Sequence, residues 1–308
     1  MRQVRLLIAA LITVATLSGC STAPQSDPFY RPTESVLEVV ALLQLHVDDD
    51  TYRFSAARDF TGKNVYRASL ERLESLEEIY VDKFRSGYLT DVIQFAKARA
   101  LERIGEYELA EHHYVLVTDL ESILIEEAER GSRVCGQLRE ARSILPDPRG
   151  SPEEAVRIFD RRAARLEELL AEVQGSHYAA IVLEETERAD LDRARYFRAL
   201  RSLDPRLDSV ALQQYQLLIQ HHRRSKLQNR HLLELGDLYV ELTRDYAHRS
   251  PPASLRFDPA TFDEYAFGAT RLYEAVAHQD GAVEKIEASR KLEAFLAFIL
   301  GVRDESLH

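Results

Sequence analysis

Histidine is the residue type whose positions first raise the question of chemistry in this chain, because imidazole nitrogens bind transition metals. Two adjacent pairs occur, His112-His113 and His221-His222, and His231 follows the second pair closely. Neighbouring side chains on a helix point about 100° apart, whereas a metal site takes its ligands from positions i and i+4 or from converging segments. The sequence therefore predicts polar histidines that face solvent, and no metal site.

Acidic and glycine-containing segments are the next candidates for a chemical site. Asp48-Asp49-Asp50 lacks the glycine and the terminal glutamate of a calcium-binding EF-hand loop, so we interpret it as a solvated helix end. Gly62-Lys63 lacks the upstream glycines of a phosphate-binding loop. A glycosidase acid needs a carboxyl group buried in apolar surroundings, and we expect Glu77-Glu78, Glu126-Glu127 and Glu184-Glu185 to lie on polar helix faces. We assign no catalytic residue and no cofactor, and we predict that the protein is not an enzyme.

Cys20 follows a segment with the form of a secretion signal. Two arginines are followed by an unbroken run of 12 apolar and small residues, Leu6 to Leu17, and then by Ser18-Gly19. A transmembrane helix needs roughly 20 apolar residues, so this run favours a signal peptide over a retained membrane span. We predict that residues 1–19 are a signal peptide, cleaved so that Cys20 becomes the first residue of the mature chain.

The four residues Leu17-Ser18-Gly19-Cys20 resemble the lipobox of bacterial lipoproteins, and the alternative is an ordinary signal peptide with a chance cysteine. The resemblance implies that the Cys20 thiol is diacylated and its new amino group acylated, which gives an anchor more stable than one acyl chain provides. Ser21 stands where an aspartate would favour retention at the inner membrane. The resemblance therefore implies the periplasmic face of the outer membrane. Residues 20–32 contain three prolines and are predicted to form an extended, acylated tether.

Composition limits the class of protein. The chain has 308 residues, of which 45% are hydrophobic, and this is enough apolar material for a large core. Its net charge of −11 becomes −13 when residues 1–19 are removed, because they contain two arginines and no acidic residue. Phosphate binding needs clustered positive charge, so a nucleic-acid partner is not expected. Lipidation of Cys20 leaves Cys135 as the remaining thiol, which we expect to be a buried structural residue without a disulfide partner.

The hydrophobic pattern is helical through most of the chain. Apolar residues recur at spacings of three and four, which predicts an all-α fold. Apart from the lipobox glycine, the glycines and prolines are predicted to mark helix ends and turns. In an N-terminal helical region at 33–145, the predicted helices lie at 33–47, from Val65 onward, at 91–104 and from 106 to about 119. Residues 48–64 are left unassigned.

A long helical hairpin is predicted at 151–203. Ser151-Pro152-Glu153-Glu154 combines an N-cap residue, a proline at the first helical position and a glutamate at the third, which indicates a helix start. Behind it lies a helix-packing seam that should stop at Gly175. The seam residues are Val156, Phe159, Ala163, Leu166, Leu170 and Val173. The preceding segment LPDPRGSP separates the region 33–145 from this hairpin and from further helices at 205–308.

Three segments carry a recurring helix-pair motif, and the first of them has an echo one period earlier in the chain. Gly105-Glu106-Tyr107-x-x-Ala110-x-x-x-Tyr114 resembles the second helix of a tetratricopeptide repeat, with Ala98 at the small-residue position of the first helix. A related pattern occurs 34 residues earlier at Leu73, Leu76 and Tyr80. The segment Leu235-Gly236-Asp237-Leu238-Tyr239 resembles the first helix of another repeat, and Ala269-x-x-x-Tyr273-x-x-Val276 is a degenerate third match.

Together with the lipobox, these motifs resemble the tetratricopeptide-repeat lipoproteins of the outer membrane, whose best-known type is the helical lipoprotein of the β-barrel assembly machinery. The resemblance covers about a third of the chain. It implies a TPR-like α-solenoid of antiparallel helix pairs, with the 151–203 hairpin as an insertion. The residues that would pack the repeats together are Tyr80, Ala98, Gly105, Tyr107, Ala110, Tyr114, Tyr215, Leu235, Gly236, Tyr239 and Tyr273.

Three functions follow from these observations. The first is a scaffold or adaptor, held at the membrane by acyl chains on Cys20, whose helical-repeat surface binds another protein of the cell envelope. The second is an enzyme acting on cell-wall glycan or peptide, because catalytic groups assemble in space and a sequence can hide them. The third is a helical protein that binds a small ligand in an apolar pocket. We predict the first.

Overall fold

The computed structural model describes residues 32–49, 65–84, 87 and 89–306. Every regular element in these ranges is a helix, which confirms the all-α prediction for the described part of the chain. The predicted signal peptide, Cys20, the tether up to residue 31, and positions 50–64 lie outside the described residues. Within the described ranges, no helix combines the length and the apolar composition needed to cross a bilayer.

The observed helices include the four predicted in the region 33–145, whose stated bounds agree within a few residues. They are α2 (Pro32–Asp49), α3 (Val65–Ile79), α4 (Val81–Phe84), α5 (Thr90–Ile104), α6 (Tyr107–Thr118), α7 (Ile125–Ser143), α8 (Pro152–Glu172), α9 (Tyr178–Arg201), α10 (Asp208–His221), α11 (Gln228–Arg249), α12 (Pro259–Ala277) and α13 (Lys285–Ser306). A short 3-10 turn at Pro205–Leu207 joins α9 to α10.

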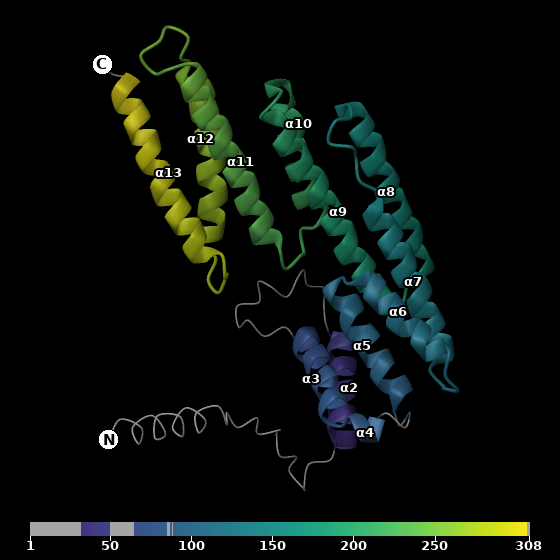
Figure 1. The fold of residues 1–308 in the computed structure, drawn as a ribbon. Helices are drawn as coiled ribbons and strands as arrows, with labels where there is room; N and C mark the ends of the chain where they lie inside the picture. The colour runs from purple at the N-terminus through teal and green to yellow at the C-terminus, as the bar shows by residue number, and fades with distance from the viewer. Residues whose placement is uncertain (1–31, 50–64, 85–86, 88, 307–308) are drawn as a thin grey trace, which may run out of the picture.

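Helices that follow one another in the sequence lie side by side and antiparallel (Figure 1). The most extensive contacts join α11 to α12, α6 to α7 and α5 to α6. The predicted hairpin is formed by α8 and α9, and it contacts helices on both sides, since α7 packs against both of its arms and α10 packs against α9. The two groups of helices at either end of the chain are therefore connected through α9.

Local sequence signals set the ends of the hairpin. Ser151 caps α8 as predicted, because its Oγ accepts a hydrogen bond of 3.1 Å from the backbone N–H of Glu154. Pro152 occupies the first helical turn, where its missing N–H is not needed. At the other end of α8, Gly175 has a φ of +82°, a backbone conformation that glycine adopts without strain. The chain reverses there and enters α9.

The residues assigned to repeat packing lie at contacts between helices. Tyr114, Ala110 and Ala98 are fully buried, and the aromatic ring of Tyr215 is also inaccessible to solvent. The others that are buried are Gly105, Tyr107, Leu235, Gly236 and Tyr273, whereas Tyr80 and Tyr239 are half-buried. Four tyrosines of this set anchor the apolar clusters between consecutive helices.

The prediction that glycines mark helix ends is wrong for a group of them inside helices. These are Gly131, Gly136, Gly236, Gly268 and Gly301. A Cβ atom on Gly131 would lie 2.6 Å from the ring of Tyr114, a distance that two carbon atoms do not tolerate. The missing side chain lets the ring of α6 press against the backbone of α7. Close packing, and not chain reversal, therefore explains this glycine.

The contact between α11 and α12 contains two more pairs in which a tyrosine ring packs against a glycine. A Cβ on Gly236 of α11 would lie 2.7 Å from the ring of Tyr273, and a Cβ on Gly268 of α12 would lie 2.7 Å from the ring of Tyr239. On each of the two helices, a tyrosine ring of the other helix therefore packs directly against the backbone of a glycine. The Tyr273 hydroxyl also donates a hydrogen bond of 2.6 Å to Oδ1 of Asp237. The ring position is consequently fixed at both ends.

We expect Gly236→Ala to destabilise the protein by about 1–3 kcal/mol, because the added methyl group must displace a ring that is already held in place. Gly301→Ala is the matched control, since it lies in an exposed part of α13 and its Cβ would meet no atom within 4 Å. That control should be more stable than the natural chain by about 0.5–1 kcal/mol, through helix propensity alone. Denaturant unfolding of both variants measures the difference. Equal effects of the two substitutions would contradict the packing argument.

Candidate functional site

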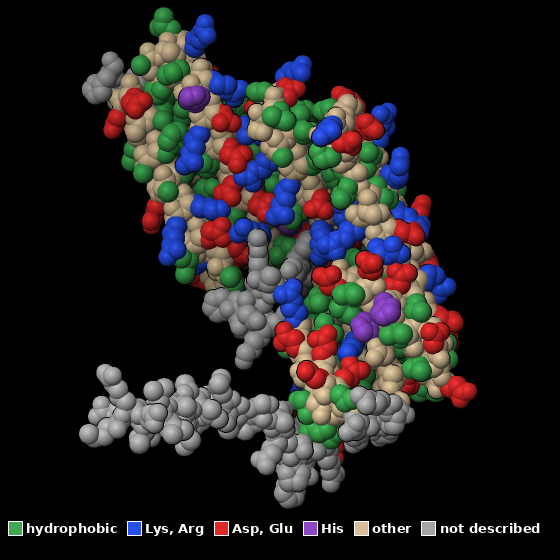
Figure 2. Space-filling model, viewed as in Figure 1, with side chains coloured by type: hydrophobic (Ala, Val, Ile, Leu, Met, Phe, Trp, Pro, Cys, Tyr) green, Lys and Arg blue, Asp and Glu red, His purple; other side chains and the backbone are tan. Residues whose placement is uncertain are grey.

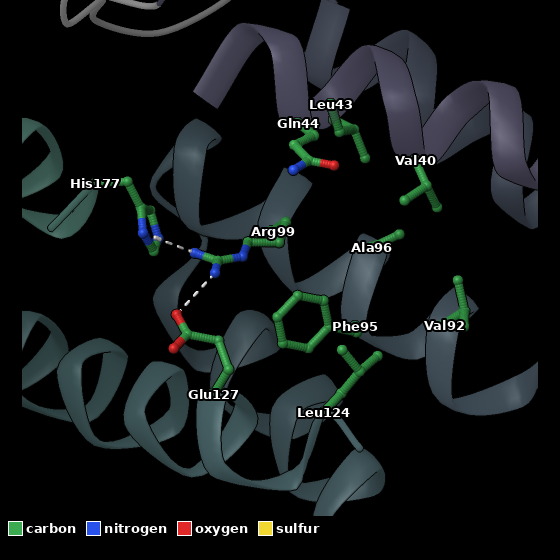
Figure 3. A pocket seen from close by; sticks show the side chains of 10 residues that line it. All are labelled: Val40, Leu43, Gln44, Val92, Phe95, Ala96, Arg99, Leu124, Glu127 and His177. Atoms are coloured by element: carbon green, nitrogen blue, oxygen red, sulfur yellow. Dashed lines mark hydrogen bonds and ion pairs between the residues drawn. The ribbon is translucent and has the colours of Figure 1, made fainter. Parts of the chain in front are cut away.

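A pocket of about 570 Å³ lies where α2, α5, the beginning of α7 and the beginning of α9 meet. This volume falls in the range of small-ligand sites. Figure 3 shows apolar side chains along its walls and polar side chains gathered at one end. The lining residues are Val40, Leu43, Gln44, Val92, Phe95, Ala96, Arg99, Leu124, Glu127 and His177. Patterns in the sequence do not indicate this pocket, since its walls come from four separated segments.

Helical spacing explains why one face of α5 supplies much of the wall. Val92, Phe95, Ala96 and Arg99 follow the i, i+3, i+4, i+7 pattern that places side chains along one side of a helix. The polar end is completed from elsewhere in the chain. His177 sits directly before α9, after the turn at Gly175. The turn between α8 and α9 therefore places the His177 imidazole next to α5.

Arg99 is the centre of the polar end. Its Nη1 donates to Oε1 of Glu102 at 3.1 Å and to Nδ1 of His177 at 3.2 Å, and its Nη2 donates to Oε1 of Glu127 at 2.9 Å. The guanidinium also lies 5.0 Å from the ring centroid of Phe95, within range of a cation–π contact. Burial alone would lower the pKa of Arg99, but the nearby carboxylates of Glu102 and Glu127 raise it. The pocket therefore carries a permanent, fixed cation.

Glu102 is the buried partner of this cation. Its side chain is inaccessible to solvent and accepts a hydrogen bond of 2.6 Å from the Tyr114 hydroxyl. Desolvation raises the pKa of Glu102, while Arg99 and the Tyr114 hydrogen bond oppose that change. An acid catalyst has to reach its substrate, and this carboxyl group is covered. Glu102 instead holds the Arg99 guanidinium in position through the hydrogen bond that it accepts from Nη1.

His177 is neutral in this setting. Burial, followed by the positive charges of Arg99, Arg103 and Arg130, lowers its pKa to about 3. Because Arg99 can only donate, Nδ1 of His177 must accept, and the proton is assigned to Nε2. Nε2 then donates to Oε1 of Glu102 at 3.2 Å. The imidazole thus orients the arginine and the glutamate without adding charge.

The prediction that Glu184 and Glu185 of α9 lie on a polar helix face is wrong. Glu184 and Glu185 are buried between helices, although we expected them on a polar face. Glu185 accepts hydrogen bonds from Nη2 of Arg162 at 2.9 Å, from Nη1 of Arg188 at 2.5 Å and from the hydroxyl of Tyr107 at 3.2 Å. A buried carboxylate is tolerated when its charge is paired and its lone pairs are occupied. Helices α6 and α8 supply Tyr107 and Arg162, and periodicity within α9 does not reveal these two partners.

The same kind of pairing continues toward the C-terminal helices. Glu234 of α11 accepts from Nη2 of Arg195 at 2.5 Å and from the Tyr215 hydroxyl at 3.2 Å. Arg201 of α9 donates to Asp208 at 2.8 Å and to Asp245 at 2.5 Å. Figure 2 shows acidic and basic side chains interspersed over this face of the molecule. Ion pairs therefore connect α9 to α10 and α11.

His231 and His222 depart from the solvent-facing prediction, whereas His221 is exposed as predicted. His231 is fully buried, and its Nε2 lies 2.5 Å from Oε1 of Glu187. His221 and His222 both contact Oδ2 of Asp190, at 3.3 and 2.9 Å, because His222 has left the helix with a φ of −110°. Burial would raise the pKa of Asp190, but the hydrogen bonds from His222 and His221 hold it below its usual range. Among the described residues, no group of three or more potential ligands has the arrangement of a metal site.

Cys135 is buried in the core, as predicted. It belongs to the apolar cluster that includes Tyr114 and Leu138. Burial raises the pKa of its thiol, and the nearby carboxylates of Glu102 and Glu111 act in the same direction. The thiolate required for nucleophilic chemistry is therefore disfavoured.

We expect His177 to make the folded protein less stable as the pH falls. Between pH 6.5 and about 3 the unfolded chain binds a proton on this residue that the folded protein does not bind. Each pH unit in this window costs at most about 1.4 kcal/mol of stability from the one group. In His177→Gln the loss between pH 6.5 and 5 should be smaller by about 1–2 kcal/mol. The control is His112→Gln, which changes an exposed histidine of α6, leaves His177 and its contacts in place and should therefore keep the loss of stability that His177 causes.

Removal of a buried arginine tests the paired charges of the hairpin. Arg162 is fully buried and bonds to Glu185 and Asp192, so Arg162→Met should destabilise the protein by about 3 kcal/mol through the charge left behind. Arg165→Met changes a neighbouring residue of the same helix whose ion pair with Glu168 is solvent-exposed. That control should cost less than about 1 kcal/mol. Guanidinium unfolding would refute the argument if the two variants had the same midpoint.

Comparison with known proteins does not place the chain in a family. A scan against models of protein families and a search of curated proteins both found no match. The function proposed below therefore depends on the sequence signals and on the geometry described above.

Proposed function

We propose that this protein is a lipid-anchored scaffold on the periplasmic face of the outer membrane, which binds another protein of the cell envelope. The anchoring part of the proposal is supported by the signal-like residues 1–19 and by Cys20 in its lipobox-like setting. The binding part is supported by the long array of helix pairs and by the pocket at its N-terminal end.

A TPR-like arrangement of the helix pairs is part of this proposal. Consecutive antiparallel pairs that contact their neighbours create extended surfaces for protein ligands. The tyrosines at Tyr114, Tyr239 and Tyr273 each fill a notch left by a glycine on the adjoining helix. Small residues that admit aromatic rings are what the repeat motif requires at such positions. These contacts support the repeat interpretation for α6–α7 and for α11–α12.

The pocket is the single observation that carries the binding function. Its walls are apolar, and its polar end is held rigidly by the hydrogen bonds of Arg99 to Glu102, Glu127 and His177. A preorganised surface of this kind loses little entropy when it binds. The polar side chains at that end are held in place by hydrogen bonds to one another, so the pocket presents a fixed arrangement of groups to a binding partner.

The anchor is tested by fatty-acid labelling of cells and by fractionation of their envelopes. We expect the natural chain in the membrane fraction and labelled by an alkyne-tagged palmitate, because two or three acyl chains make a stable anchor. Cys20→Ala should be unlabelled and should leave the membrane fraction. Cys135→Ala is the control, since its buried thiol is not an acylation site, and it should remain labelled. Label retained in Cys20→Ala would refute lipidation at this residue.

The partner is tested by chemical crosslinking in intact envelopes, followed by purification of the natural chain and of Cys20→Ala. If the proposal is correct, specific envelope proteins are enriched with the anchored chain and lost or reduced with the unanchored one. Recovery of cell-wall fragments alone, with activity of the purified chain on cell-wall substrates, would contradict a scaffold function.

A further inference from the structure

We propose that the pocket binds a large apolar side chain from an extended segment of the partner protein, with the uncharged peptide group of that residue at the Arg99 end. This inference rests on the proposed scaffold function and specifies the chemistry that its binding site accepts. Three properties of the pocket carry it: apolar walls, balanced charge, and unused hydrogen-bonding capacity for a neutral amide.

The walls favour an aliphatic or aromatic side chain. Phe95, Leu43 and Leu124 come from three different segments and face a common space, as Figure 3 shows. Val92 is half-buried and Gln44 is exposed, so the space is reached from solvent past these two residues. Transfer of a Leu or Phe side chain from water into such a space favours binding, because it removes apolar surface from water.

The charge at the polar end favours an uncharged ligand. The cation of Arg99 is already paired with Glu102 and Glu127, and Glu127 also accepts from Arg130 at 3.1 Å. An anionic ligand would have to approach two carboxylates in order to reach Arg99. A cationic ligand would approach the guanidinium itself. A neutral polar group avoids both repulsions.

The hydrogen-bonding groups that remain match a peptide unit. The bonds of Arg99 to Glu102, His177 and Glu127 use three of the five N–H groups of the guanidinium. Its Nε–H makes no hydrogen bond to another described residue and is not among the fully buried polar atoms, so it can donate to a carbonyl oxygen. Gln44, which projects from α2 above Arg99 in Figure 3, carries both an amide donor and an amide acceptor. A backbone C=O and N–H complement this pair, whereas the carboxylate of a fatty acid only accepts and is charged.

The test uses a series of small probes that share an apolar group and differ in charge. The full mature chain with Cys20→Ala is titrated with N-acetylphenylalaninamide, N-acetylphenylalanine, phenylethylamine and decanoate, and binding is followed by ligand-observed NMR. We expect the neutral amide to bind in the millimolar range, as its few atoms allow, and about 5-fold or more tighter than the anion or the cation. Tighter binding of decanoate would overturn the proposal in favour of a fatty-acid site.

Two variants assign the binding to the pocket. Val92→Trp places a bulky ring at the entrance and should reduce the affinity for the neutral amide by about 10-fold or more. Leu109→Trp changes an exposed leucine of α6 outside the lining set and should leave it unchanged. Gln44→Ala is a milder change at an exposed position, so it decides the question if Val92→Trp does not fold. Gln44→Ala should reduce the affinity for the neutral amide by about 2–10-fold and leave the affinity for decanoate unchanged. Unchanged amide affinity in Gln44→Ala and in a folded Val92→Trp would overturn the proposal.

Crosslinking in envelopes separates this inference from the scaffold function. If the natural chain and a folded Val92→Trp capture the same partner equally, the pocket is not the docking site and the scaffold function stands. If the neutral amide binds as expected and the anchored natural chain captures no envelope protein, the scaffold function fails and the chemistry of the pocket stands. Loss of the partner in Val92→Trp, together with the expected order of probe affinities, supports both.

Discussion

Pairs of buried carboxylates and arginines set the alignment of the helices in this structure. Glu102 and Glu185 are inaccessible to solvent, and each is paired with at least one arginine. A carboxylate removed from water without a partner is costly enough to change its protonation or to disrupt the fold. Helices α8 and α9 therefore cannot slide past one another without separating Arg162 from Glu185. This directional requirement fixes register, which apolar contacts alone specify less strongly.

Tyrosine–glycine contacts determine how closely the helices approach, while the ion pairs determine how they align. The rings of Tyr114 and Tyr273 occupy space that any side chain larger than hydrogen would fill. Their hydroxyl groups then donate to Glu102 and Asp237, so the same residues join the apolar packing to the polar network. Tyrosine suits this place better than phenylalanine because it has an apolar ring and a polar end.

The pocket is a consequence of this network. Arg99 pairs with the buried Glu102 on one side and reaches the pocket on the other, where it meets Glu127 and His177. Because His177 stays neutral, the polar end remains balanced over the ordinary range of pH. The features that stabilise the helix packing therefore also prepare a rigid site that favours an uncharged partner group.

Features that depend on residues close together in the chain could be predicted from the sequence. The spacing of apolar residues was sufficient to predict the helices, and the Ser151-Pro152 start of α8 was predicted because a cap involves neighbours in the chain. Burial of Cys135 followed from its residue type. The anchoring at Cys20 remains a prediction from sequence, since that residue lies outside the described part of the chain.

Which charged residues are buried, and where a ligand could bind, depend on contacts between helices that lie far apart in the sequence. Glu185 has the same residue type and helical surroundings as an exposed glutamate, and its burial depends on Arg162 and Tyr107 from other helices. Likewise, His177 and Arg99 are 78 positions apart and meet only when the hairpin turn reaches α5. Periodicity describes one helix at a time, whereas burial and pockets arise where several helices meet. The physical reason is that the energy of a buried charge is set by its neighbours in space.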